Sequence, residues 1–323
     1  MTMLPAQSEP PAEKPPIPTA GAPTAPPTEP GSASPAKNPL GRPFWRLFTS
    51  SGVSNLSDGM LQAALPLLAA SLTRDPLAVS AMASLAFLPW LLFAIPAGAV
   101  VDRVNRRTAM AVANVARAGM LIAMAVATAA GAATLPLLYA TAFVLGCAEV
   151  VYDNAARAML PAVVGKSGLE RGNSLLATAE SVGNIFLGAP IGAWLFAIAV
   201  SIPFWSNAVA YLVSAGLILT VAGRFRAPRA APTRLRADIA VGLRWLMHHR
   251  LLRTLMVTTG LAGLLQSMIN GILVLFALEE LGLSERGFGI ALAVAGVGAI
   301  VGSVASPRLT AVLGPMPLSL GFG

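Results

Sequence analysis

Four ionisable side chains lie inside long apolar stretches of the sequence, away from its charged loops: Asp58, Arg117, Glu149 and Glu180. A charged group surrounded by hydrocarbon is costly, so it is usually paired with another group or faces a polar cavity. An acid in such a place could exchange a proton in competition with a bound substrate. The same groups could instead form a permanent ion pair that fixes the packing of helices, and the sequence leaves both interpretations open.

The elements that must position these groups are apolar segments long enough to cross a membrane. The chain has 323 residues, of which 55% are hydrophobic and 11% charged, with a mean hydropathy of +0.71. Segments of roughly 20 apolar residues without a period-two alternation predict membrane-spanning helices, because only helices or closed barrels satisfy the backbone in lipid. The expected fold class is an all-α polytopic membrane protein with spans near residues 46–72, 79–100, 108–130, 135–156, 174–199, 204–222, 254–279 and 288–305.

The charged residues predict how these spans are oriented and grouped. Of the 22 Lys and Arg, Arg117 lies in a span and Arg74 and Arg286 lie in the opposite loops, and the other 19 fall on the side of the amino terminus. The positive-inside rule therefore predicts a cytoplasmic amino terminus in a bacterial plasma membrane. Residues 1–44 are expected to form a disordered tail, since the first 40 contain 12 prolines and few apolar residues. The tail has no apolar segment of the kind that a secretory signal requires.

Four regions follow from this reading. After the tail, residues 45–223 are expected to form a six-helix bundle, and residues 254–323 to contain spans 7 and 8 and the beginning of a ninth. Between them lies a basic cytoplasmic loop, 224–253. Its second half places Ile239, Leu243 and Leu246 at helical spacing after Asp238, which predicts an amphipathic helix on the inner membrane surface.

The depths of the buried ionisable groups suggest which of them could meet. At a rise of about 1.5 Å per residue from the inner boundary, Asp58 lies about 18 Å deep, Arg117 about 15 Å, Glu149 about 12 Å and Glu180 about 10 Å. Asp58 and Glu149 are therefore the best partners for Arg117. Near the inner end of the same span as Glu149, Asp153 and Arg157 have the spacing of an intrahelical ion pair.

Amide side chains inside the spans are candidates for a substrate cavity, although such amides often only form hydrogen bonds between helices. These candidates are Asn55, Gln62, Asn114, Asn184, Gln266 and Asn270.

A charged loop follows the second span, with Gly98, Asp102-Arg103, Asn105 and Arg106-Arg107 in sequence. Topology alone would explain its arginines but not Asp102. The pattern resembles the signature loop of the major facilitator superfamily, with Asn105 in place of a glycine. We expect Gly98 to let the helix end pack closely and Asn105 to accept a left-handed turn.

The resemblance implies two six-helix bundles, held together on the inner side by this loop, and a second copy of it after span 8. Gly302, Ser306 and Arg308 form a weaker version of the pattern there. In span 5, Gly188, Pro190 and Gly192 resemble a motif of the antiporter branch, and residues 152–164 and 238–255 are similar to the macrolide and enterobactin exporters.

Membership of that group would imply proton-coupled export of amphipathic small molecules of the drug or siderophore type, with lipid, protons and substrate as partners. Because the family has about 12 spans and this sequence supplies eight and a beginning, an alternative is a truncated chain that transports nothing. A half that needs a second chain is the other form of that alternative.

Other functions find little support in the sequence. The segment "GKS" at 165–167 lacks the glycine that a phosphate-binding loop requires, because that position is Leu160. His248 and His249 point about 100° apart on a helix and make a poor metal pair, and Cys147 is the single cysteine. The basic residues lie in loops between spans, which argues against nucleic-acid binding. We expect no cofactor, no metal site and no enzymatic activity.

Overall fold

The chain folds into long helices, with no strand in the parts that the structure describes. The computed structural model describes residues 40–223, 225 and 235–298. The first four helices are α1 (Arg42–Leu72), α2 (Pro76–Val101), α3 (Arg106–Ala129) and α4 (Leu135–Val164). After the short 3-10 turn η1 (Lys166–Gly168), α5 (Leu169–Ser181), the π-helical segment η2 (Val182–Gly188) and α6 (Ala189–Ile198) run on without a break, and α7 (Ile202–Leu219) follows. The remaining elements are α8 (Leu235–His248), α9 (Arg250–Leu275), its π-helical end η3 (Phe276–Glu280) and a helix over 285–298.

Local sequence signals explain where the helices begin and end. The Asp75 carboxylate caps α2 by accepting a 2.9 Å hydrogen bond from the Leu77 N–H, and Pro76 occupies the first turn. Asn105 caps α3 in the same way, accepting a 3.1 Å hydrogen bond from the Arg107 N–H. Its φ is −72°, so the expectation of a left-handed Asn105 is wrong, and the side-chain cap is what the turn uses. Gly131 and Gly165, with φ of 67° and 68°, follow α3 and α4 and supply the positive φ.

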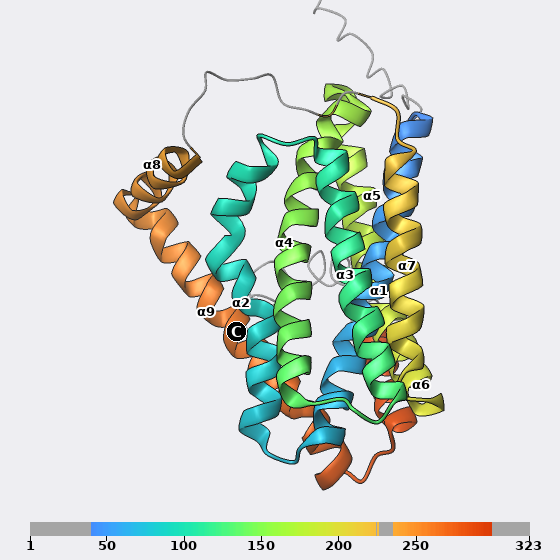
Figure 1. Cartoon of the computed structure of the whole chain (residues 1–323). Coiled ribbons are helices and arrows are strands. Elements are labelled where there is room, and N and C mark those ends of the chain that lie inside the picture. The colour runs from blue at the N-terminus through green and yellow to red at the C-terminus, as the bar shows by residue number, and fades with distance from the viewer. Residues whose placement is uncertain (1–39, 224, 226–234, 299–323) are drawn as a thin grey trace, which may run out of the picture. The chain divides into compact units, whose positions relative to one another are not determined.

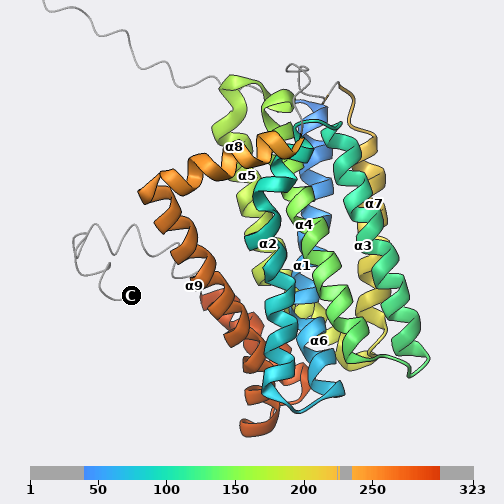
Figure 2. The same cartoon turned by 60° about the vertical axis from the view of Figure 1, so that its left-hand side comes forward.

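Helices α1 to α7 pack side by side as a bundle, and α9 packs along α2 (Figures 1 and 2). Within the bundle, α4 lies between α2 and α3, while α7 packs against α1 and α3. Helix α1 also runs along α5, η2 and α6. The α2–α3 loop and the α3–α4 loop lie at opposite ends of the bundle, and these two ends are called the loop end and the far end below.

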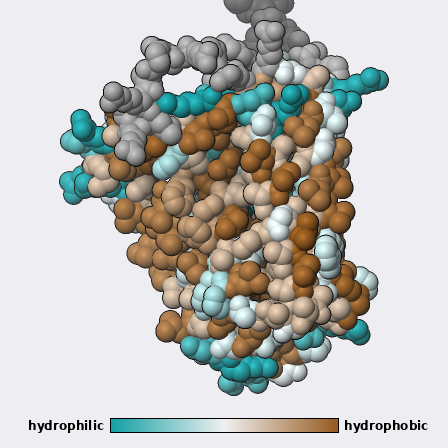
Figure 3. Space-filling model, in the orientation of Figure 1, coloured by the Kyte–Doolittle hydropathy of each residue, from teal (hydrophilic) through white to brown (hydrophobic). Residues whose placement is uncertain are grey.

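The exposed surface of the bundle is apolar between its two ends. Figure 3 shows hydrophobic residues over the middle of the visible face and hydrophilic ones at its ends. Large apolar side chains point outward along the helices, among them Val112, Val115, Val209 and Leu261. Among the described residues, six helices are long and apolar enough to cross a membrane: α2, α3, α4, the continuous helix Leu169–Ile198, α7 and Arg250–Glu280. The predicted all-α polytopic membrane fold is therefore confirmed.

Two of the eight expected spans are not among those six. Helix α1 has the length, but the serines and Asp58 that it turns toward its neighbours make it less apolar than the others. The eighth expected span begins as the helix over 285–298, and its remainder lies outside the described residues. Most helices also begin a few residues earlier than expected, so that α1 begins at Arg42, within the predicted tail, and α9 at Arg250, within the predicted loop.

Helix α8 occupies the second half of the basic loop. It begins at Leu235, before the expected start at Asp238, and packs against α2. Ile239 and Leu246 are partly buried, but Leu243, expected on the same face, is 47% exposed.

Candidate functional site

A buried ion pair joins α3 to α1 in the middle of the bundle. The Arg117 Nη1 lies 3.3 Å from the Asp58 Oδ1, and the two side chains are 1% and 14% exposed. The same Nη1 donates a 3.3 Å hydrogen bond to the Ser54 hydroxyl, one turn away from Asp58 on α1. Because a lone guanidinium could not stay ionised in this place without a large cost, the pair holds α1 and α3 in register.

Two tyrosines complete the surroundings of Arg117. The Tyr211 hydroxyl, on α7, donates a 2.6 Å hydrogen bond to the Asp58 Oδ1. The Arg117 guanidinium carbon lies 5.0 Å from the ring centroid of Tyr211 and 5.6 Å from that of Tyr152 on α4, within the range of cation–π attraction. The sequence reading missed both tyrosines and Ser54. A usable signal was the scarcity of tyrosine, since the chain has only three.

A network of small polar groups continues from the ion pair toward the loop end. The Ser50 and Ser214 hydroxyls lie 2.9 Å apart, and the Asn114 Nδ2 donates a 2.8 Å hydrogen bond to the Ser214 hydroxyl. Asn114 is fully buried, so it joins α3 to α7 and does not face a cavity. Its Oδ1, together with the Nε and Nη2 of Arg117, has no hydrogen-bond partner in the described part of the chain.

Close backbone contact between α1 and the helix formed by η2 and α6 positions Asp58. A Cβ added at Gly59, next to Asp58, would lie 2.5 Å from the Asn184 carbonyl oxygen, and one at Gly188 would lie 2.5 Å from the Gly59 Cα. One turn further, a Cβ at Gly192 would overlap the Met60 carbonyl. The Gly188 and Gly192 pair, singled out in the sequence as an antiporter-like motif, is thus the contact surface for α1. Pro190 stands between them in the first turn of α6.

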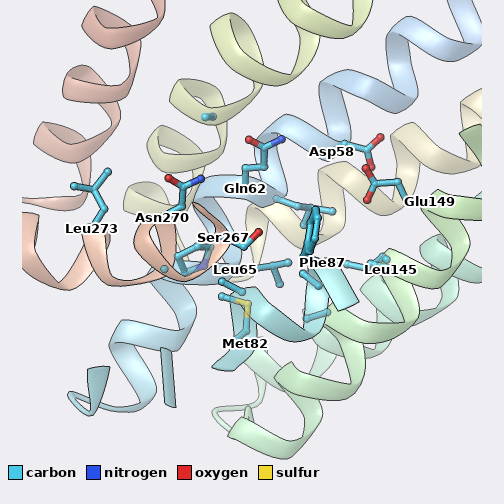
Figure 4. Close-up of a pocket in the computed structure, with 18 of the residues that line it drawn as sticks. Asp58, Gln62, Leu65, Met82, Phe87, Leu145, Glu149, Ser267, Asn270 and Leu273 are labelled. Carbon is cyan, nitrogen blue, oxygen red and sulfur yellow. The ribbon is translucent and has the colours of Figure 1, made fainter. Parts of the chain in front are cut away.

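A cavity of about 380 Å³ opens beside the ion pair, between the bundle and α9. Its wall is mostly aliphatic and aromatic, with Phe87 and Trp90 from α2 and Leu145 from α4. Figure 4 shows the Asp58 and Glu149 side chains close together at one side of the cavity, with Gln62, Asn270 and Ser267 further along it. Tyr211 also lines this wall. A mostly apolar cavity with a few polar groups is the usual form of a small-molecule site.

Only two of the six amides expected in a cavity line this one. Gln62 on α1 and Asn270 on α9 face it, and Gln266 is exposed and donates a 3.1 Å hydrogen bond to the Asn270 Oδ1. Asn55 and Asn184 lie at the contact between α1 and η2. With the buried Asn114, three of the six expected amides thus lie between helices.

The other predicted acids occupy different places. Glu149 lines the cavity on α4, whereas Glu180 is exposed on α5 and does not line it. The Asp153 Oδ2 lies 4.0 Å from the Arg157 Nη2, one turn below Glu149, so the expected pair at the end of α4 forms at the limit of contact.

The loop between α2 and α3 binds the ends of two other helices of the bundle. The Arg106 Nη1 donates a 2.7 Å hydrogen bond to the Ala158 carbonyl near the end of α4. The Arg107 Nη1 donates a 2.9 Å hydrogen bond to the Val221 carbonyl just after α7. Cationic side chains near the carboxyl ends of helices also interact favourably with the helix dipole.

Asp102 is held less tightly than Arg106 and Arg107. Asp102 ends α2, is 69% exposed and lies 4.0 Å from the Arg106 Nη2. The Arg103 N–H donates a 3.0 Å hydrogen bond to the Val100 carbonyl. A Cβ at Gly98 would meet nothing closer than the Asn154 Oδ1 at 3.9 Å, so the expectation that Gly98 is needed for close packing is wrong. The expected second copy, with Gly302, Ser306 and Arg308, lies outside the described residues.

The long apolar helices, which surround a buried ion pair and a mostly apolar cavity, define a multi-pass membrane protein. Residues 47–323 match the Major Facilitator Superfamily. The chain belongs to this family, whose members are membrane transporters.

Comparison with known proteins agrees with the family assignment. The sequence is 34% identical over 149 residues to uncharacterized MFS-type transporters of Mycobacterium tuberculosis and Mycobacterium bovis. Those matches cover 45% of this chain and 33% of each relative, so the matched part is about a third of the relatives' length. A crystal structure of a mutant of the nucleoside transporter NupG has the same fold, with a TM-score of 0.65 and 12% identity over 84% of this chain and 69% of that one.

Proposed function

We propose that the protein is a secondary active transporter that exports amphipathic small molecules of the drug or siderophore type in exchange for protons. The observation that carries this proposal is the 380 Å³ cavity, which has an apolar wall and two carboxylates, Asp58 and Glu149, at one side. An amphipathic molecule fits such a wall, and a carboxylate at its edge can carry the coupling proton. Membership of a transporter family also supports a role in transport.

The position of the cavity fits alternating access. One wall belongs to α1, α2 and α4 of the bundle and the other to α9, so a movement between these two parts would change access to the site. The α2–α3 loop, with Asp102, Arg103, Arg106 and Arg107, lies at the loop end, where it would stabilise one of the two positions of these parts. The excess of basic residues at this end supports a cytoplasmic location for it, for the start of α1 and for α8, in a bacterial plasma membrane.

A flux assay tests the proposal. The protein is reconstituted in liposomes with a pH gradient, and tetraphenylphosphonium and erythromycin serve as amphipathic probes of different size. We expect probe movement that depends on the gradient and collapses when a protonophore is added. The same assay with Asp58→Asn and with Glu149→Gln should lose the dependence on the gradient, while Glu180→Gln, away from the cavity, keeps more of the activity.

Probe movement that ignores the gradient would overturn proton exchange. An inserted protein that moves neither probe would contradict transport by this chain, and would favour the alternative of a half that works with a second chain.

A further inference from the structure

Among the acids near the cavity, Glu149 is the one without a fixed partner. Asp58 is neutralised by Arg117 and held by the Tyr211 hydroxyl, and Asp153 is paired with Arg157. Across the described residues, no hydrogen bond or ion pair is formed by the Glu149 carboxylate, which lines the cavity. It is therefore free to bind what enters.

The charges around Glu149 leave this part of the wall negative. The groups that act on it are Asp58 on α1, Arg117 on α3, Asp153 on its own helix and Glu180 on α5. Arg117 is already balanced by Asp58, and Arg157 balances Asp153. Glu149 adds one negative charge that no nearby side chain in the described part of the chain compensates, and an unpaired charge within an apolar wall favours a positive ligand.

Aromatic side chains lie on the same wall. Helices α2 and α4 run in the same direction, and a Cβ at Gly146 of α4 would overlap the Ala86 carbonyl of α2. Because both helices rise by about 1.5 Å per residue, Glu149 and Trp90, each three or four positions further, lie at about the same depth. Trp90 and Phe87 both line the cavity. Aromatic faces next to a carboxylate are the surroundings that organic cations prefer.

We propose that Glu149 is a cation-binding position, which takes the positively charged group of an amphipathic monocation whose apolar part lies against Phe87, Trp90 and Leu145. This inference rests on the proposed function and narrows its substrate class. The same carboxylate carries a proton when the cavity holds no cation. Cation binding then releases that proton to water, so proton and substrate exclude each other at one oxygen pair, while Asp58 remains the fixed partner of Arg117.

A binding experiment on the full chain tests this separately from transport. The probes are tetraphenylphosphonium, which carries a permanent charge, and triphenylphosphine oxide, a neutral molecule in which an oxygen replaces one of the four phenyl groups on phosphorus. Binding to protein in lipid nanodiscs is measured by equilibrium dialysis at several pH values. We expect the wild-type protein to prefer the phosphonium and to bind it more weakly as the pH falls, with little change for the oxide.

Single substitutions test whether Glu149 is the residue that binds the cation. Glu149→Gln should weaken phosphonium binding at least tenfold and remove its pH dependence, while oxide binding changes less than twofold. The matched control is Glu170→Gln, which changes an exposed acid on α5 that neither lines the cavity nor acts on Glu149, and it should leave both affinities unchanged.

Unchanged phosphonium binding in Glu149→Gln would overturn the inference, as would equal losses for both probes or a wild-type protein that binds neither. Glu149-dependent binding without flux in liposomes would leave the cation site standing and contradict only the transport proposal.

Discussion

The Arg107 guanidinium binds the carbonyl oxygen of Val221 at 2.9 Å, across 114 positions of sequence. This bond fastens the α2–α3 loop to the end of α7, while Arg106 fastens it to α4. The arginines of the loop thus have a structural task within the first bundle. Asp102, exposed and only loosely paired, has none of comparable weight.

Substitutions in this loop should separate the two roles. Arg107→Met is expected to lower stability by about 1–3 kcal/mol, because it removes a charge-assisted hydrogen bond and leaves a helix-end carbonyl unpaired. Asp102→Asn should change stability by less than about 0.5 kcal/mol, since an exposed pair at this distance contributes little. Thermal unfolding in detergent, followed by size-exclusion chromatography of a fluorescent fusion, measures both. If Asp102→Asn reduces flux with unchanged stability, the loop acts in the transport cycle, and full flux would contradict that role.

Breaking the pair of Arg117 and Asp58 should lower the stability of the protein far more than the loop substitutions do. Arg117→Met leaves a carboxylate without its cation in the bundle, and breaking such a pair typically costs about 3–5 kcal/mol. We expect a clear loss of folded protein in the same unfolding assay, partly restored when Asp58→Leu is added. Arg157→Met, which breaks the looser pair at the end of α4, is the control. Equal effects of the two arginine changes would show that the buried pair carries no special weight.

The contact between α1 and α6 makes a third prediction. Gly192→Ala should lower the thermal midpoint by several degrees, because its Cβ meets the Met60 backbone, which cannot move as a side-chain tip can. Gly216→Ala on α7 is a matched control, since nothing lies within 4 Å of its Cβ position, and it should be neutral or stabilising. A neutral Gly192→Ala would mean that α1 and α6 separate at little cost.

The proposed orientation can be tested with single cysteines in a Cys147→Ser background. Ala132→Cys, in the loop at the far end, should react with a membrane-impermeant maleimide in intact cells. Asp102→Cys, at the loop end, should react only after the cells are permeabilised. Both positions are exposed, so access to the reagent and not burial decides the result. The reverse pattern would place the amino terminus outside.

Apolar length and charge placement predicted the helices well, because both are local properties of the sequence. The depth estimate also brought Asp58 and Arg117 together, since two straight helices of known rise can be compared without knowing their neighbours. The approach fails where a contact depends on which element packs against a helix at a given height. Asn55 and Gln62, two turns apart, lie on nearly the same face of α1, yet Asn55 meets η2 while Gln62 faces the cavity.

Hydrogen-bond partners of the ion pair that come from a third helix could not be predicted from the sequence either. Nothing local marks Tyr211 as a donor to Asp58, because the two residues are 153 positions apart and meet only when α7 packs on α1. Asn105 shows the opposite error. A family pattern suggested a special backbone there, whereas ordinary helix capping explains the residue.

The close contact between α4 and α2 at Gly146 determines which walls of the cavity can move. Because Gly146 brings the two backbones together, the wall that carries Glu149 and the wall that carries Phe87 and Trp90 form a single rigid unit. A change in the width of the cavity then requires a movement of α9, which forms the opposite wall and supplies Ser267, Asn270 and Leu273. The cavity would therefore keep its acid and its aromatic faces at constant spacing while it tightens or loosens around molecules of different bulk.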